Sequence, residues 1–168
     1  MLDVDDFKQF NDRFGHQAGD EALVFIARVL RETLRTDVDV VCRYGGEEFA
    51  VLLPNTALVV QEGVGEPAAA TGKAHRGSLE NLRTEAAPAI AERLRAAVEE
   101  LGRSAVTPLR PQAVTISIGV SCTTADAFDP DELVAAADKA LYLAKRLGKN
   151  RVETFHPSDA HPPEARPA

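Results

Sequence analysis

Several features are rare or absent in this sequence, and their absence argues against particular classes of protein. Tryptophan is absent, and aromatic residues make up only 5% of the chain. The two cysteines, Cys42 and Cys122, have no spacing typical of a disulfide or metal site, so we expect buried free thiols. An apolar run of about 18 residues is also missing, which argues against a transmembrane helix. Met1 is not followed by a charged-then-apolar leader, so we expect a cytoplasmic protein.

The chain also lacks an excess of positive charge. Its formal net charge is −7, whereas a nucleic-acid-binding surface would show a basic stripe. We therefore expect no nucleic acid partner, although a few well-placed lysines suffice to bind a nucleotide. A length of 168 residues with 45% hydrophobic residues predicts one domain with a substantial core.

Hydrophobic periodicity predicts strands that alternate with helices. Strands are expected at residues 1–5, 38–43, 48–53, 113–121 and 151–155, the fourth with a single apolar face. A short helical or turn segment is expected at 7–14, and helices at about 19–35, 86–101 and 130–147. This order predicts an α/β (α+β) fold with a mixed, mainly antiparallel sheet and packed helices, close to a ferredoxin-like βαββαβ core.

Two segments do not fit that pattern. Residues 61–77 are rich in Gly, Ala and Pro and are expected to be a flexible insertion. Residues 156–168 form a Pro-rich segment expected to be a disordered tail, so the domain should cover residues 1–155. The first strand reads as if its beginning were missing, and we expect a truncated or fragmentary amino terminus.

The stretch Arg43-Tyr44-Gly45-Gly46-Glu47-Glu48-Phe49 joins two apolar runs and predicts a β-hairpin. The glycines are expected to supply the positive φ of a tight turn. Adjacent carboxylates at a turn repel each other, so the needs of folding alone do not explain why two of them stand side by side here. We interpret Glu47 and Glu48 as ligands for a cation.

Asp3, Asp5 and Asp6 follow the first strand, where they could meet the hairpin carboxylates. Carboxylates combined with phosphate oxygens suit Mg²⁺, and such a site can activate a hydroxyl for attack on phosphorus. The alternative interpretation of this acidic cluster is a solvated loop.

Lysines near this point could bind phosphates. Lys8 follows the acidic cluster, and Lys145 and Lys149 lie near the end of the last predicted helix. The alternative role of the latter two is to complement the helix dipole. Asn11 and Asp20 could read a guanine edge, or could serve a turn and a helix cap respectively.

These motifs together resemble a known family. The segments 2–8, 11–12, 15–20 and 43–49 resemble the GGDEF domain of bacterial diguanylate cyclases, in a GGEEF variant. Residues 117–120 and 137–150 are also similar to that family. The motifs occur in the family's order along most of the chain.

The resemblance implies condensation of two GTP into cyclic di-GMP with release of two pyrophosphates. It implies metal binding by Asp3, the Val4 carbonyl, Glu47 and Glu48, with one glutamate helping to deprotonate the ribose 3′-hydroxyl. The metal would be Mg²⁺, two ions per GTP site, with Mn²⁺ as a substitute. Catalysis would require a head-to-head homodimer. The implied substrate-binding residues are Phe7, Lys8, Asn11, Asp20, Gly45, Gly46, Lys145 and Lys149.

The chain departs from the family at the product-inhibition motif, Arg-x-x-Asp. Asp39 occupies the aspartate position, but Thr36 stands where the arginine should be and Arg35 is one residue away. We expect weak or absent product inhibition. The alternatives to an active enzyme are a regulatory module that binds GTP or cyclic di-GMP without turnover, and a related palm-type cyclase acting on another substrate.

Overall fold

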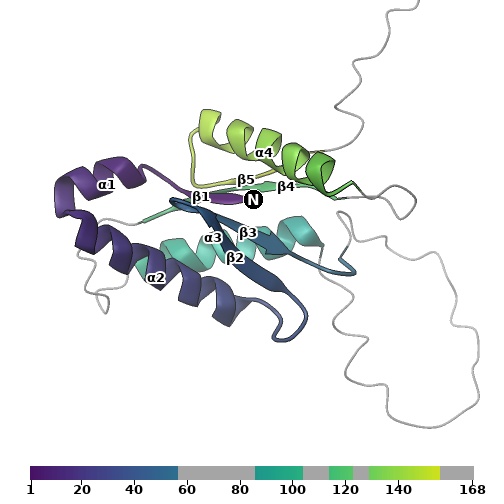
Figure 1. The fold of residues 1–168 in the computed structure, drawn as a ribbon, viewed down its shortest axis with the longest axis horizontal. Helices are drawn as coiled ribbons and strands as arrows, with labels where there is room; N and C mark the ends of the chain where they lie inside the picture. The colour runs from purple at the N-terminus through teal and green to yellow at the C-terminus, as the bar shows by residue number, and fades with distance from the viewer. Residues whose placement is uncertain (57–85, 104–113, 123–128, 156–168) are drawn as a thin grey trace, which may run out of the picture.

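The computed structural model describes residues 1–56, 86–103, 114–122 and 129–155 (Figure 1). The expected insertion at 61–77 and the expected tail at 156–168 lie outside these residues. No helix in the described ranges is long and apolar enough to cross a membrane. The elements in chain order are β1 (Leu2–Val4), α1 (Phe7–Phe14), α2 (His16–Thr33), β2 (Val40–Gly45), β3 (Glu48–Leu52), α3 (Ala87–Arg103), β4 (Ile116–Val120), α4 (Pro130–Arg146) and β5 (Val152–Thr154).

The five strands form one sheet in the order β2-β3-β1-β4-β5. All neighbouring pairs are antiparallel except β4 and β5, which are parallel. This confirms the predicted α+β class with a mixed, mainly antiparallel sheet. β1 lies at the centre, so the residues that follow it are flanked by both neighbouring strands.

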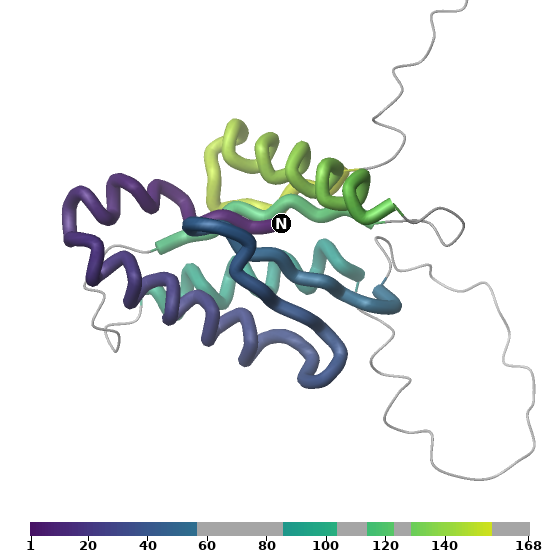
Figure 2. The backbone as a smooth tube through the Cα atoms, in the orientation of Figure 1, coloured from purple at the N-terminus to yellow at the C-terminus, as the bar shows by residue number. Residues whose placement is uncertain are grey.

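The helices cover the two faces of the sheet unequally. α4 packs against β4 and β5 on one face, while α2 and α3 lie on the other (Figures 1 and 2). The hydrophobic core between the sheet and α2 and α3 includes fully buried side chains from three elements, Leu2, Ile26, Leu30 and Val98. α4 contributes mainly small buried residues, Ala137, Ala140 and Ala144, which let it lie close to β4.

α2 begins earlier than the sequence pattern predicts. Gly15, with a φ of 88°, ends α1, and α2 starts directly at His16. Gly19 therefore lies inside the helix and does not introduce it. The small residue is needed there for close packing, because a Cβ at Gly19 would lie 1.8 Å from Oδ1 of Asn11. Asp20 is consequently not a helix cap, and that alternative interpretation is wrong.

Other helix ends follow the local chemistry. The side chain of Asp129 accepts hydrogen bonds from the N–H groups of Asp131 and Glu132, and Pro130 occupies the first helical position of α4. α3 begins at Ala87, which places Pro88 in the first turn where its missing N–H costs nothing. Both starts agree with the prediction.

Two predictions about burial were wrong. All five residues of β4 are buried, not one face only, because the sheet carries helices on both sides at this strand. Cys42 is exposed because it lies on the edge strand β2, and Cys122 is half-buried.

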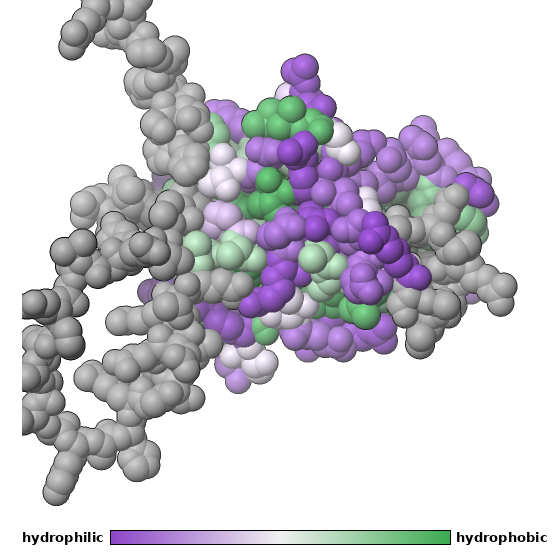
Figure 3. All heavy atoms as spheres, turned by 180° about the vertical axis from the view of Figure 1, so that it is seen from behind, coloured by the Kyte–Doolittle hydropathy of each residue, from purple (hydrophilic) through white to green (hydrophobic). Residues whose placement is uncertain are grey.

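Figure 3 shows that the face opposite the view of Figure 1 is mostly hydrophilic where coloured residues are visible, with apolar side chains in small separate groups.

Candidate active site at the end of the central strand

The central strand pairs a buried carboxylate with the hairpin. Asp3 lies opposite Glu48 in the β1–β3 register, and the N–H of Val4 donates to the Glu47 carbonyl at 3.3 Å. Asp3 is only 7% exposed, whereas Glu47 and Glu48 are half-buried. The predicted convergence of carboxylates from β1 and the hairpin is thus present in the backbone register.

The hairpin itself is irregular. Its register shifts between Arg43 and Gly45, as in a β-bulge, and the Arg43 side chain donates from Nε to the Gly46 carbonyl at 2.7 Å. Of the two glycines, only Gly46 has a positive φ, at 44°. The prediction that both supply positive φ was therefore wrong for Gly45, which belongs to β2.

A pocket of about 300 Å³ opens beside these residues. A size near 300 Å³ is at the small end of the range for ligand pockets. Its carboxylate-bearing wall comes from β1, the start of α1 and the hairpin, and its cationic groups come partly from the end of α4. The lining residues are Asp3, Val4, Asp5, Asp6, Phe7, Lys8, Gln9, Glu47, Lys145 and Lys149.

Two of the three predicted phosphate-binding lysines each face a carboxylate. Nζ of Lys145 lies 2.8 Å from Oδ2 of Asp3, and Nζ of Lys149 lies 2.5 Å from Oδ1 of Asp6. Lys145 also stands in the last turn of α4, where a cation complements the helix dipole. Lys8 is exposed at the rim, in the first turn of α1.

The electrostatics of Asp3 favour a cation. Burial raises the pKa of Asp3 above its ordinary value, and the nearby Glu47 and Glu48 carboxylates raise it further, while Lys145 opposes the shift. A carboxylate in this situation is stabilised by any positive charge placed beside it. Lys145 supplies one such charge, and a divalent cation could supply a stronger one.

The donor chemistry therefore fits a hard metal ion, although the side chains are not gathered around one. In the described part of the chain, no three carboxylate, histidine or cysteine side chains are grouped closely enough to hold a metal ion. Asp3 with Glu47 and Glu48 supplies the oxygen ligands that Mg²⁺ prefers, with phosphate oxygens to complete the shell. Asp3 would have to exchange Lys145 for the ion.

The predicted guanine-reading residues, Asn11 on α1 and Asp20 on α2, do not line this pocket. Oδ1 of Asn11 is buried and accepts no hydrogen bond. Asp20 is exposed on the second turn of α2. A buried, unpartnered acceptor is costly, so Asn11 is suited to receive an N–H from a ligand.

Asp39 does not line the pocket either, and its carboxylate is paired with Arg35. The Arg35 side chain forms an ion pair with it, and the Arg35 backbone N–H donates to its Oδ2 at 2.9 Å. Nη2 of Arg35 further donates to Oγ1 of Thr56 at 2.9 Å. Arg35 lies one position before the arginine of the family's product-inhibition motif. Its contacts with Asp39 hold together the loop between α2 and β2.

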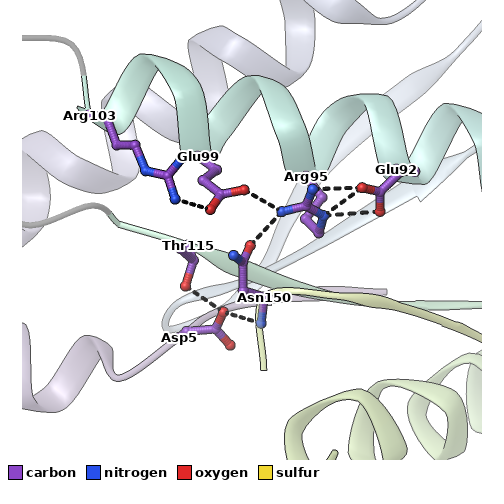
Figure 4. Close-up of polar contacts among 7 residues, drawn as sticks. All are labelled: Asp5, Glu92, Arg95, Glu99, Arg103, Thr115 and Asn150. Carbon is purple, nitrogen blue, oxygen red and sulfur yellow. Dashed lines mark hydrogen bonds and ion pairs between the residues drawn. The ribbon is translucent and has the colours of Figure 1, made fainter. Parts of the chain in front are cut away.

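Sequence reasoning named Asp5 only as part of the acidic cluster and did not predict its connection to other segments. Asp5, Asn150 and Arg95 form a hydrogen-bonded chain that links β1 to α3 (Figure 4). The three positions are far apart in the sequence, and only their hydrogen bonds identify them as a unit.

Comparison with known proteins agrees with this fold. The family model described as "Diguanylate cyclase, GGDEF domain" matches residues 1–76 and 78–151. The chain belongs to the GGDEF domain family, which confirms the resemblance inferred from the sequence motifs.

Among its relatives, "Probable diguanylate cyclase DgcT" of Escherichia coli is 36% identical over 90% of this chain and 28% of its own length. "Diguanylate cyclase A" of Treponema denticola is 39% identical over 90% of this chain and 33% of its own length. The chain therefore spans about a third of these curated relatives.

Solved structures show the same fold. The "active GGEEF domain of a diguanylate cyclase from Vibrio cholerae" has a TM-score of 0.69 at 29% identity, and the match covers 92% of this chain and 80% of that one. The GGDEF domain of DgcB from Caulobacter crescentus, solved in complex with c-di-GMP, has a TM-score of 0.65 at 28% identity, covering 92% and 74%.

Proposed function

We propose that this chain is a diguanylate cyclase domain that condenses two GTP into cyclic di-GMP and two pyrophosphates. The observation that carries the proposal is the pairing of buried Asp3 with Glu48 across β1 and β3, beside a pocket that Lys145 and Lys149 also line. Carboxylates for a metal and lysines for phosphates are what transfer of a nucleotidyl group requires.

The protein's own groups act by positioning and by charge. Asp3, the Val4 carbonyl, Glu47 and Glu48 would hold Mg²⁺, two ions per GTP site, or Mn²⁺ in its place. When bound, the metal would neutralise charge that develops on the phosphates. Phe7, Lys8, Lys145 and Lys149 would hold the triphosphate, Asn11 and Asp20 the guanine, and Gly45 and Gly46 would leave room for the nucleotide.

The reaction forms one bond and breaks one at each α-phosphorus. A ribose 3′-oxygen attacks the α-phosphorus of the other GTP, the bond to pyrophosphate breaks, and Glu47 or Glu48 accepts the hydroxyl proton. Each nucleotide is attacked by the other, so two domains must face each other as a head-to-head homodimer. The gain in rate then comes chiefly from bringing the two nucleotides together. We further propose that the domain works in the cytoplasm, where GTP is supplied.

The direct test is incubation of the chain with GTP and Mg²⁺, with chromatographic detection of cyclic di-GMP. Glu48→Gln should reduce the rate by about 10² or more, in line with the loss of one charge-stabilising group. Glu100→Gln, a change at an exposed glutamate of α3, is the matched control and should leave the rate unchanged.

One observation favours a second candidate function, a regulatory module that binds GTP or cyclic di-GMP without turnover. Asp3 is already paired with Lys145, which competes with a metal ion. Tight GTP binding without cyclic di-GMP formation over a wide range of Mg²⁺ concentrations would favour that module and contradict the enzyme.

A further inference from the structure

Asp5 lines the pocket, yet its carboxylate is fully engaged by protein groups. Thr115 donates from Oγ1 to Oδ2 at 2.7 Å, and Ser117 donates from Oγ to Oδ1 at 2.6 Å. The backbone N–H of Asn150 donates to Oδ2 at 3.0 Å. A carboxylate with these donors is an anchor for the chain around it, in contrast to Asp3, which faces a single lysine.

The segment that Asp5 anchors is a turn in an unfavourable conformation. Gly148, Lys149 and Asn150 have φ values of 118°, 64° and 45°, all in the positive range. For residues with a Cβ this conformation is costly and persists only where surrounding contacts hold it. The hydrogen bond from the Lys149 N–H to the Ala144 carbonyl, at 3.1 Å, ties one side of the turn to α4.

The other side of the turn is held from α3. Nη1 of Arg95 donates to Oδ1 of Asn150 at 2.8 Å and to Glu99 at 2.6 Å (Figure 4). Nε and Nη2 of Arg95 bind Glu92. The Arg95 side chain is only 14% exposed, and hydrogen bonds to Glu92 and Glu99 raise its pKa, so it stays charged and fixed. Arg95 is thus clamped between two glutamates of its own helix.

The consequence of this clamp is the position of Lys149. Lys149 directly precedes Asn150 in the turn, and its Nζ reaches Asp6 and the pocket. Lys149 is one of the cations proposed to meet the triphosphate. A lysine side chain is long and flexible, so its useful position depends on where its backbone is held.

We propose that Arg95, Asn150 and Asp5 are positioning residues, which hold the 148–150 turn so that Lys149 meets the phosphates of the bound nucleotide. The proposal rests on the proposed function, because it deepens the role of the same pocket. None of the three needs to touch the reacting atoms.

The test uses the full chain with Mg²⁺ and 3′-deoxyguanosine triphosphate, which lacks the attacking hydroxyl and is not condensed. Asn150→Gly removes the side-chain acceptor while glycine retains the positive φ. Arg95→Ala removes the donor. Each should weaken triphosphate binding about tenfold in calorimetry, the usual scale for a charge-assisted hydrogen bond. Guanosine, which carries no phosphate, should bind as before.

Arg103→Ala is the matched control. Arg103 also pairs with Glu99 on α3, at an exposed position, but it reaches Asn150 only indirectly, through Glu99 and Arg95 (Figure 4). It should bind the triphosphate like the wild type. A general structural effect would instead weaken the binding of triphosphate and of guanosine equally, or would weaken triphosphate binding as much in Arg103→Ala as in Arg95→Ala. Either result would overturn the proposal.

A double-mutant cycle identifies Lys149 as the residue acted upon. In a Lys149→Ala background, Asn150→Gly should have no further effect on triphosphate affinity. Independent, additive losses would overturn the proposal, because Asn150 would then act without Lys149.

Amide hydrogen exchange separates failure of this inference from failure of the proposed function. The Asn150 N–H should be protected in the wild type, and its exchange should become about tenfold faster in Arg95→Ala but not in Arg103→Ala. Unchanged exchange in Arg95→Ala would overturn the positioning role alone. Absence of triphosphate binding by the wild type would overturn the proposed function, and with it the role toward phosphate.

Discussion

Nζ of Lys145, at the end of α4, lies 2.8 Å from the buried carboxylate of Asp3, at the centre of the sheet. The carboxylate is therefore neutralised by the protein when no cation is bound. Asp3 would hold a metal ion only in place of Lys145, whose ammonium would then be available to a phosphate. Replacement of Lys145 by a metal ion at Asp3 would thus prepare both the metal-binding and the phosphate-binding part of the site.

Asp3→Asn should separate stability from activity. The pKa of Asp3 is raised in the fold, so the folded state holds its proton more tightly than the unfolded state does. The free energy of unfolding therefore falls as pH rises from the ordinary carboxyl pKa, about 4, through the raised value. Asparagine does not ionise, so Asp3→Asn does not lose this stability as the pH rises. Its melting temperature should match the wild type in acid and exceed it at neutral pH.

In the same variant, cyclic di-GMP formation should fall by about 10² or more, since a proposed metal ligand is lost. Differential scanning fluorimetry from pH 4 to 8 measures the first effect, and Asp12→Asn, at an exposed position of α1, is the control. A lower melting temperature than wild type at neutral pH would contradict the prediction.

Asp39→Ala should cost stability and leave product sensitivity unchanged. The Asp39 side chain is only 1% exposed and holds both the Arg35 guanidinium and its backbone N–H. Its loss should cost about 2 kcal/mol, which lowers the melting temperature by roughly 4–8 °C in a domain of this size. The exposed Asp37→Asn is the control, because asparagine tolerates the φ of 62° at that position.

Because Arg35 already occupies Asp39, the wild type should show weak or no inhibition by added cyclic di-GMP. Initial rates at increasing product concentration measure this. Strong inhibition that Asp39→Ala abolishes would show instead that the displaced arginine still forms a product site.

Asn11→Ala and Gly19→Ala should weaken recognition of guanine. Asn11→Ala removes the side-chain oxygen of Asn11. Gly19→Ala displaces the same oxygen, because a Cβ at Gly19 would collide with Oδ1 of Asn11. The preference for GTP over ITP, which lacks the exocyclic amine, should fall about tenfold in each variant. Competition binding measures the ratio, with Gln17→Ala, an exposed change on α2, as control. An unchanged preference would place guanine recognition elsewhere.

Gly119→Ala should destabilise the contact between β4 and α4. A Cβ there would lie 2.1 Å from the Ala137 carbonyl and 2.2 Å from the Leu141 nitrogen, both backbone atoms. α4 would have to move outward, at a cost of about 3 kcal/mol. Gly45→Ala, whose Cβ meets nothing nearer than 4.0 Å, should change stability by less than about 0.5 kcal/mol. Denaturant unfolding compares the two variants.

The sequence predicted the elements well where local chemistry determines them. Asp129 and Pro130 fix the start of α4, and the Gly-bearing hairpin between apolar runs fixes β2 and β3. It failed where tertiary packing overrides local preference. The pattern predicts that Gly19 introduces a helix, whereas it lies inside α2 at a close contact with Asn11. The alternation at Ser117 predicts an exposed side chain, whereas Ser117 is fully buried and donates to Asp5.

The site was predictable only in part for the same reason. Asp3, Glu47 and Glu48 could be suggested from their residue types and the family motifs. Arg95 could not, because its role depends on two glutamates one helical turn away and on an asparagine more distant in the chain. The spacing of Arg95 to its two glutamates is local, but its contact with Asn150, on which the proposed role depends, has no local spacing that the sequence could reveal.

The β1–β3 register also bears on how the protein folds. Asp3 and Glu48 meet only when strands distant in the chain align, so we expect the carboxylates proposed for catalysis to come together with the slow, high-contact-order centre of the sheet. A chain that has not completed this pairing would lack the proposed metal site. Nucleotide with Mg²⁺ should therefore act as a ligand of the native state alone, and raise the melting temperature as its concentration increases.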